Sequence, residues 1–295
     1  MITQRVNAPV WVVSRELLRF RADELGKCWL RVRRTSEPEG FHDLRVASRR
    51  LREAIKLFAP CYPRHNMTRL RKDLRQLTRD LGQIRNTDEA IAYLEPLEEL
   101  LPGDQQLAFG ETLTRLKGER KKELFRLTEN LRKLDLIALQ SDLLRTINRP
   151  YLFSSAPIDP FTPIGNYLQA YLEEREQPVL QLLPAALHAE DHQSQHRLRI
   201  AIKKYRYVLE LLMLLKLEAS APLISGVKEY QEVLGTIHDL DVFTELLQKP
   251  AFRQCWSNDL AHELASRRHR SFLGFLVLHE NSPLTELCCQ ARSLL

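Results

Sequence analysis

The chain has 295 residues and a formal net charge of +6, from 44 Lys and Arg against 38 Asp and Glu. This length allows two domains or one large one, and the presence of only 10 glycines argues against a strand-rich fold with many tight turns. The chain starts without the pattern of a secretory signal, and no apolar run reaches the roughly 18 residues of a membrane span. We therefore expect an all-α, cytoplasmic protein without a membrane partner.

The five cysteines are odd in number and form no C-x-x-C pair: Cys28, Cys61, Cys255, Cys288 and Cys289. A disulfide framework needs an even set, and structural zinc sites bring cysteines together at short, regular spacings. The cysteines thus predict neither disulfides nor structural zinc, in keeping with a reducing cytoplasm.

Apolar residues recur every three or four positions over long stretches, which predicts amphipathic helices. In chain order, we expect them over residues 9–30, 39–59, 65–100, 104–133, 135–148, 161–175, 178–188, 192–216, 221–248, 251–278 and 283–293. The segment 148–163 contains four prolines and should separate two groups of helices. We place a boundary near residue 157, so that residues 1–157 and 158–295 each form an antiparallel four-helix bundle with accessory helices.

Two parts of the sequence repeat each other. Residues 42–52, HDLRVASRRLR, align without gaps to residues 196–206, HRLRIAIKKYR. The segment LGQIRNTD at 81–88 aligns to LGTIHDLD at 234–241, and Pro9-Val10 aligns to Pro163-Ile164. Three markers in one order at nearly one spacing predict two homologous halves.

Each repeat carries a row of cations. On a helical wheel at 100° per residue, one arc of about 80° holds the first basic stripe, which we define as His42, Arg45, Arg49, Arg52 and Lys56. The matching arc holds the second basic stripe, defined as His196, Arg199, Lys203 and Arg206. Apolar residues occupy the far side of both helices: Leu44, Ala47, Leu51, Ala54, Ile55 and Phe58 in the first, and Leu198, Ala201, Tyr205, Val208, Leu209 and Leu212 in the second.

Like charges three or four residues apart on a helix repel each other, so each stripe needs a compensating partner. That partner is either a set of carboxylates on neighbouring helices or an extended polyanion lying across the cations, and the residues alone leave both open. If both stripes faced one space, they would line a basic pore or groove. Arginine at most positions favours anion contact, because its planar guanidinium binds phosphate oxygens in bidentate fashion.

His42 and His196 head the stripes, and three roles are open to them besides a structural one: donor to a phosphate, phosphoryl acceptor or metal ligand. His238, Asp239 and Asp241 are a conceivable metal cluster, but the aligned residues 85–88, RNTD, are poor ligands. We predict no metal site and no cofactor. Asp88 and Asp241 are instead expected to form salt bridges with an arginine on a neighbouring helix.

The sequence lacks the phosphate-binding loop, the dinucleotide-binding glycine motif, the H-E-x-x-H metal motif and the G-x-S-x-G nucleophile elbow. No nucleophile and base pair can be identified either. We therefore predict no catalytic residue and a binding protein in place of an enzyme.

Residues 42–52 closely resemble the H-x-x-R-V-x-x-R-R-x-R signature of the CHAD family, the conserved histidine α-helical domain. The second copy and the two Leu-Gly-x-Ile segments resemble the rest of its pattern, so that the resemblance covers roughly residues 8–290. It implies two pseudo-symmetric helical bundles around a basic central pore, which binds inorganic polyphosphate without catalysis, often at polyphosphate granules. Many members also carry a catalytic domain, for which we expect no room here, so the chain resembles a stand-alone member.

Carried over residue by residue, the resemblance implies these polyphosphate-binding residues: His42, Arg45, Arg49, Arg50, Arg52, His196, Arg199, Lys203, Lys204 and Arg206. From the stripe itself and from the helix that follows each stripe, we add four further cations as candidate binding residues: Lys56, Arg75, Arg79 and Lys228. Asn86 stands where an acidic residue is expected, which weakens the expected salt bridge of the first half. The alternative functions are RNA or DNA binding through the same stripes, or phosphoryl transfer by a histidine. Other polyanions are further candidate partners.

Overall fold

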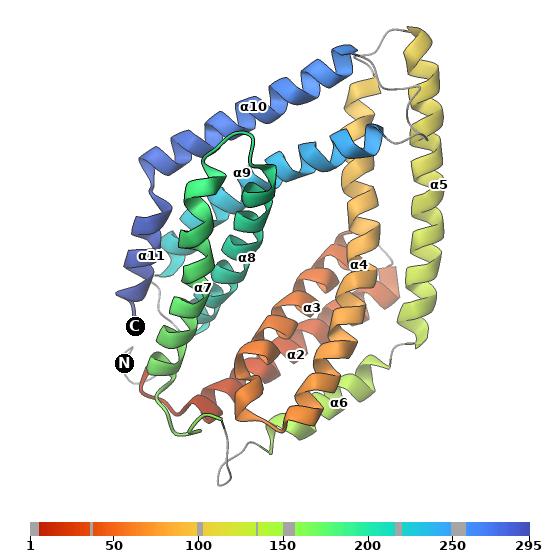
Figure 1. Cartoon of the computed structure of the whole chain (residues 1–295). Helices are drawn as coiled ribbons and strands as arrows, with labels where there is room; N and C mark the ends of the chain where they lie inside the picture. The colour runs from red at the N-terminus through yellow and green to blue at the C-terminus, as the bar shows by residue number, and fades with distance from the viewer. Residues whose placement is uncertain are drawn as a thin grey trace. The chain divides into compact units, whose positions relative to one another are not determined.

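The structure, a computed structural model, describes residues 6–35, 38–98, 103–133, 135–149, 157–215, 220–248 and 258–295. Every regular element in these ranges is a helix, which confirms the all-α prediction (Figure 1). None of the described helices is both long and apolar enough to cross a membrane.

The chain divides into two compact units. The N-terminal unit consists of residues 7–100 and 110–164, and the C-terminal unit consists of residues 1–6, 101–109 and 165–295. The boundary predicted at residue 157 stays a prediction, and residues 150–156 beside it lie outside the described ranges.

The N-terminal unit is built from long helices joined by short connections. They are α2 (Val10–Thr35), α3 (Pro38–Phe58), the short 3₁₀ helix η1 (Ala59–Cys61), α4 (Arg64–Glu98), most of α5 (Gly103–Lys133) and α6 (Leu136–Ile147). Helix α3 packs between α2 and α4, and α6 packs on α2 and α4. These helices agree with the predicted ones to within a few residues.

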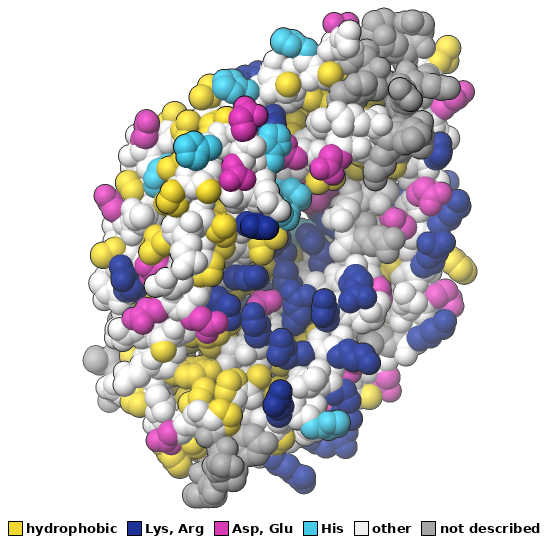
Figure 2. Space-filling model, viewed as in Figure 1, with side chains coloured by type: hydrophobic (Ala, Val, Ile, Leu, Met, Phe, Trp, Pro, Cys, Tyr) yellow, Lys and Arg dark blue, Asp and Glu magenta, His cyan; other side chains and the backbone are white. Residues whose placement is uncertain are grey.

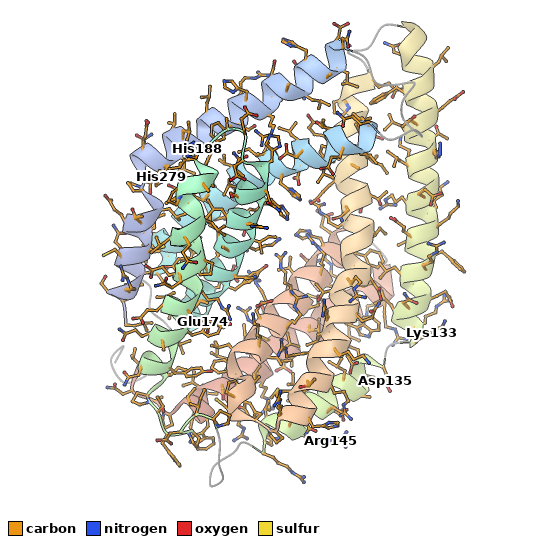
Figure 3. All side chains as sticks on the ribbon, viewed as in Figure 1. Lys133, Asp135, Arg145, Glu174, His188 and His279 are labelled. Carbon is orange, nitrogen blue, oxygen red and sulfur yellow. The ribbon has the colours of Figure 1, made fainter. Side chains whose placement is uncertain are left out.

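Helix α6 shows how local sequence sets an element's ends. Asp135 caps its start, because a carboxylate oxygen accepts a hydrogen bond from the backbone N–H of Ala138 at 2.8 Å. Arg145 lies in the last turn, where a cation interacts favourably with the helix dipole. Figure 3 labels Asp135 and Arg145 at the two ends of α6. Its buried apolar residues then hold α6 against the unit: Leu136, Leu139, Leu143 and Ile147.

The C-terminal unit contains α7 (Ile164–Ala186), α8 (His192–Leu214), α9 (Ser220–Leu247), α10 (Asn258–Asn281) and α11 (Leu284–Arg292). Helix α9 is central, since α8, α10 and α11 all pack on it. The predicted start of a helix at residues 251–257 lies outside the described residues, and so does Cys255.

The separate helices predicted over 161–175 and 178–188 are wrong. Helix α7 runs without a break from Ile164 to Ala186, with Pro178 and Pro184 inside it. Both prolines are on its exposed side, whereas Leu172, Val179 and Leu183 form a buried face across the predicted gap. Each proline removes one backbone hydrogen bond, and the continuous buried face outweighs that cost.

The aligned pairs Pro9-Val10 and Pro163-Ile164 lie side by side. Pro9 and Pro163 form an isolated antiparallel bridge. The Val10 N–H donates to the Thr162 carbonyl at 2.9 Å, and the Ile164 N–H donates to the Ala8 carbonyl at 2.9 Å. The bonding is reciprocal, and α2 and α7 each begin directly at this bridge.

Candidate functional site

The first basic stripe lies on α3, whose opposite face is fixed by burial. Leu44, Leu51 and Ile55 are fully buried, as predicted for the apolar face. The stripe residues Arg45, Arg49, Arg52 and Lys56 are half-buried, and His42 is exposed. Figure 2 shows Lys and Arg side chains gathered on the part of the N-terminal unit formed by α3 and α4. The guanidinium and ammonium groups therefore remain within reach of a ligand.

A cavity of about 500 Å³ lies at the N-terminal end of this stripe, and we call it the His42 cavity. His42 and Arg45 enter it from α3, Arg85 from α4 and Arg120 from α5. Cations from three helices thus meet around one space. A small anionic group placed there would contact several of them at once.

Two carboxylates in or beside the His42 cavity already form ion pairs with its arginines. Asp88 forms an ion pair with Arg120, and Glu89 pairs with Arg85 at 2.7 Å just beside the cavity. Burial, followed by the positive charges of Arg85 and Arg45, lowers the pKa of His42. An anion would have the opposite effect, because it would stabilise the imidazolium form.

Arg85 and Arg120 line the His42 cavity without being among the predicted binding residues, and Arg120 is the harder of the two to find from sequence. It lies in a part of α5 with charges of both signs, a pattern typical of a solvated helix face, and nothing in its spacing marks it. Its pairing with Asp88 confirms the predicted salt bridge of the first half, despite Asn86. Only the packing of α5 beside α4 shows that this pair lines the His42 cavity.

The second basic stripe lies on α8 with the same arrangement. Leu198, Tyr205 and Leu212 are fully buried, whereas His196, Arg199, Lys203 and Arg206 are half-buried. Arg206 is held by its own unit, because it pairs with Glu210 at 2.6 Å and donates to the Gln231 side-chain oxygen at 2.9 Å. Arg52 likewise contacts Glu53 at 3.2 Å. These two stripe positions are already engaged with acceptors.

His196 and His238 form a close pair between α8 and α9. Their ring centroids are 4.1 Å apart, and the rings are tilted by 39°. Burial, the neighbouring His196 and Arg199 lower the pKa of His238 to about 4, and burial together with Arg199 lowers the pKa of His196. At neutral pH the pair is therefore uncharged. His238 occupies the position aligned with Arg85 of the first half.

Asp241 is the centre of a structural network in the C-terminal unit. Its carboxylate accepts from Arg268 Nε on α10 at 2.6 Å and lies 3.0 Å from His192 Nδ1. Arg268 also donates to the Gln195 side-chain oxygen at 2.7 Å. The predicted salt bridge of Asp241 is thus confirmed. No set of three His, Cys, Asp or Glu side chains within the described ranges is arranged to hold a metal ion.

The other predicted binding residues are spread over their units. Arg75 and Arg79 are exposed on α4, and Lys228 on α9 pairs with Glu232 at 3.2 Å. Lys204 is exposed off the arc of the second stripe. Arg50 interacts electrostatically with Cys28 of α2, where it opposes the rise in the thiol pKa caused by burial. A basic pore shared by both stripes stays a prediction.

Comparisons with known proteins agree with this fold. The structure is similar to the "Crystal structure of the CHAD domain from the plant Ricinus communis", with a TM-score of 0.64 and 22% identity over 98% of this chain and 92% of that one. It is also similar to "PptA from Streptomyces chartreusis", with a TM-score of 0.68 and 15% identity over 92% of this chain and 100% of that one. A search of curated protein sequences found no significant match. The family profile described as "CHAD domain" matches residues 16–248, and the chain therefore belongs to the CHAD domain family.

Proposed function

We propose that this protein binds inorganic polyphosphate, without catalysis, through the two basic stripes. The observation that carries the proposal is the orientation of the stripes: each lies opposite a fully buried apolar face and none of its residues is buried in the core. The CHAD domain family is associated with polyphosphate, which supports this choice of polyanion. A cytoplasmic location at polyphosphate granules stays a prediction.

A linear polyphosphate suits a row of cations on consecutive helical turns. Stripe residues recur every three or four positions, so neighbouring cations are about 5–6 Å apart along the helix. A flexible chain of linked phosphates can place one anionic group near each of them. Binding releases the counterions of the polyanion, and the affinity should therefore fall steeply with salt concentration.

The surroundings of His196 support a role in binding and not in catalysis. His196 Nδ1 is buried and makes no hydrogen bond to any described residue, so no described carboxylate orients the ring through this nitrogen. A histidine that accepts or shuttles a phosphoryl group needs such an orienting partner. The nearest aromatic neighbour, His238, is itself neutral at pH 7.

The test removes two cations from one stripe at a time. We expect Arg45→Ala with Arg49→Ala, or Arg199→Ala with Lys203→Ala, to weaken polyphosphate binding at least tenfold, about 1.4 kcal/mol, in calorimetry. The matched control is Arg115→Ala with Lys121→Ala, which removes two exposed charges of α5 outside both stripes. Unchanged affinity in both stripe variants, with helical circular dichroism intact, would remove the stripes from the mechanism.

The same calorimetry separates polyphosphate from the other candidates. Single-stranded RNA at equal phosphate concentration should fail to displace long-chain polyphosphate, and efficient displacement would favour nucleic-acid binding. The length of the polyphosphate should stay constant during incubation with the protein. Shortening of the chain, or acid-labile phosphohistidine on the protein, would contradict a non-catalytic role.

A further inference from the structure

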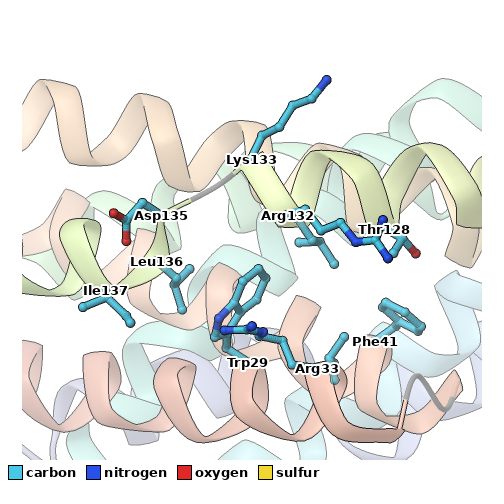
Figure 4. Close-up of a pocket in the computed structure, with 11 residues that line it drawn as sticks. Trp29, Arg33, Phe41, Thr128, Arg132, Lys133, Asp135, Leu136 and Ile137 are labelled. Atoms are coloured by element: carbon cyan, nitrogen blue, oxygen red, sulfur yellow. The ribbon is translucent and has the colours of Figure 1, made fainter.

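The N-terminal unit contains a second cavity, which shares Phe41 with the His42 cavity but is otherwise lined by different residues. It has a volume of about 560 Å³ and lies between the C-terminal half of α2, the start of α3, the end of α5 and the start of α6 (Figure 4). We call it the Trp29 cavity. Small-molecule sites in proteins range from about 300 to 1,000 Å³, so its size suits a small ligand.

The lining of the Trp29 cavity is mixed, and buried side chains from four helices form its apolar part. Trp29 and Val32 come from α2, Phe41 from α3, Leu131 from α5 and Leu136 from α6, and each is less than 8% exposed. Figure 4 shows the Trp29 indole pointing from α2 into the space between the end of α5 and the start of α6, with Phe41 and Leu136 on either side of it. Large apolar surfaces that meet around a space favour a ligand with an apolar body.

Positive charge lies at the edge of this apolar space. In Figure 4 the Arg33 guanidinium lies beside Trp29 and the Arg132 side chain extends along the cavity below α5, whereas Lys133 points away. Arg132 pairs with Glu129 at 2.7 Å on its own helix. Arg33 forms no ion pair with any described residue. An anion at this edge would therefore meet a guanidinium that the described part of the chain does not neutralise.

Two other polar side chains of the Trp29 cavity already make hydrogen bonds to nearby backbone groups. The Asp135 carboxylate accepts from the backbone N–H of Ala138 in capping α6. The Thr128 hydroxyl donates to the Leu124 carbonyl at 2.8 Å. The cavity thus offers an apolar part for a hydrocarbon body and a cationic edge for one anionic group. An all-charged polyphosphate chain does not match the apolar part of the cavity, because burying its charges beside Trp29 and Phe41 is costly.

We propose that the Trp29 cavity binds a small amphipathic anion. Its aliphatic or aromatic body packs against Trp29 and Phe41, and its single carboxylate, sulfonate or phosphate pairs with Arg33 and Arg132. This site is independent of polyphosphate binding by the basic stripes.

The test uses Trp29 as the reporter. The chain has three tryptophans, Trp11, Trp29 and Trp256, and Trp11→Phe with Trp256→Phe leaves Trp29 alone. We expect decanoate, kept below its critical micelle concentration, to change Trp29 fluorescence in a saturable way. Arg33→Ala with Arg132→Ala should weaken this binding at least tenfold, and decanol, which has the same chain without the charge, should bind at least tenfold more weakly. Calorimetry on the chain with all three tryptophans repeats the measurement if the double Phe variant does not fold.

The matched control is Lys121→Ala with Arg126→Ala, which removes two exposed charges of α5 that do not line the Trp29 cavity. This control should keep the affinity for decanoate. Long-chain polyphosphate should not displace decanoate, and displacement would overturn the independence of the two sites. A missing saturable response, or equal affinity for decanoate and decanol, would overturn the proposal. Binding to phosphatidylglycerol vesicles without any response to free decanoate would also overturn it, and would indicate a lipid surface.

Discussion

At the scale of single residues, aligned positions of the two repeats hold side chains that differ in charge at neutral pH. Arg85 of the first repeat always carries a charge, whereas the aligned His238 is neutral at pH 7 because burial, His196 and Arg199 hold its pKa near 4. Asp241 acts in the opposite direction, and Lys203 adds to the lowering. Acidification therefore protonates His238 and adds a positive charge beside the second basic stripe.

The lowered pKa of His238 makes folding stability depend on pH. His238 has a pKa below that of an unfolded histidine, so between about pH 6.5 and 4 the unfolded chain binds more protons than the folded one. The free energy of unfolding should therefore decrease as the pH falls from 7.5 to 5. We expect His238→Gln to decrease less over this range, as measured by urea denaturation at each pH. His65→Gln, which alters an exposed histidine of α4, should follow the original chain, and equal slopes for all three proteins would contradict this account.

At the scale of elements, helix packing decides how replacing a glycine by alanine changes the free energy of unfolding. Gly118 lies inside α5, and apart from the helix's own nearby backbone an added Cβ there would meet no described atom within 4 Å. Gly165 lies at the start of α7, where an added Cβ would be only 2.2 Å from the side chain of Val6. The same substitution should thus have opposite effects in the two helices.

Gly118→Ala should increase the free energy of unfolding by about 0.5–1 kcal/mol, because alanine loses less backbone entropy in a helix. Gly165→Ala should decrease it by about 1–3 kcal/mol, because Val6 must move away. Chemical denaturation followed by circular dichroism measures both values. A stabilising Gly165→Ala would show that the contact with Val6 does not constrain α7.

At the scale of the whole molecule, the question is whether the two stripes act on one polyphosphate chain. Two sites joined through one ligand gain affinity from the high local concentration of the second site once the first is occupied. A short ligand cannot gain in this way if it reaches only one stripe. Ligand length is therefore the variable that separates joint from independent binding.

We expect calorimetry to give two tripolyphosphate ions per protein but one long polyphosphate chain per protein. The variant with Arg199→Ala and Lys203→Ala should bind one tripolyphosphate, and its affinity for the long chain should fall towards that of the short ligand. Two long chains bound per protein would show that the stripes act separately. The variant with Arg115→Ala and Lys121→Ala should keep the original stoichiometry for both ligands.

The sequence by itself determined the features that depend on local spacing. Cations and apolar residues three and four positions apart lie on fixed sides of a helix whatever surrounds it, so the helices, both stripes and the buried faces of α3 and α8 could be predicted. The salt bridges of Asp88 and Asp241 could be predicted as a type of contact, although the sequence did not name the arginine of either pair.

Only the tertiary structure decided which distant residues meet. It placed Arg120 of α5 at the same cavity as His42 of α3, brought the His196 and His238 rings into contact, and placed Trp29 at a cavity shared with three other helices. It also kept α7 continuous through Pro178, because burial along one face outweighs a lost backbone hydrogen bond. Such contacts depend on how helices pack, and residues far apart in the chain carry no periodic signal that relates one to the other.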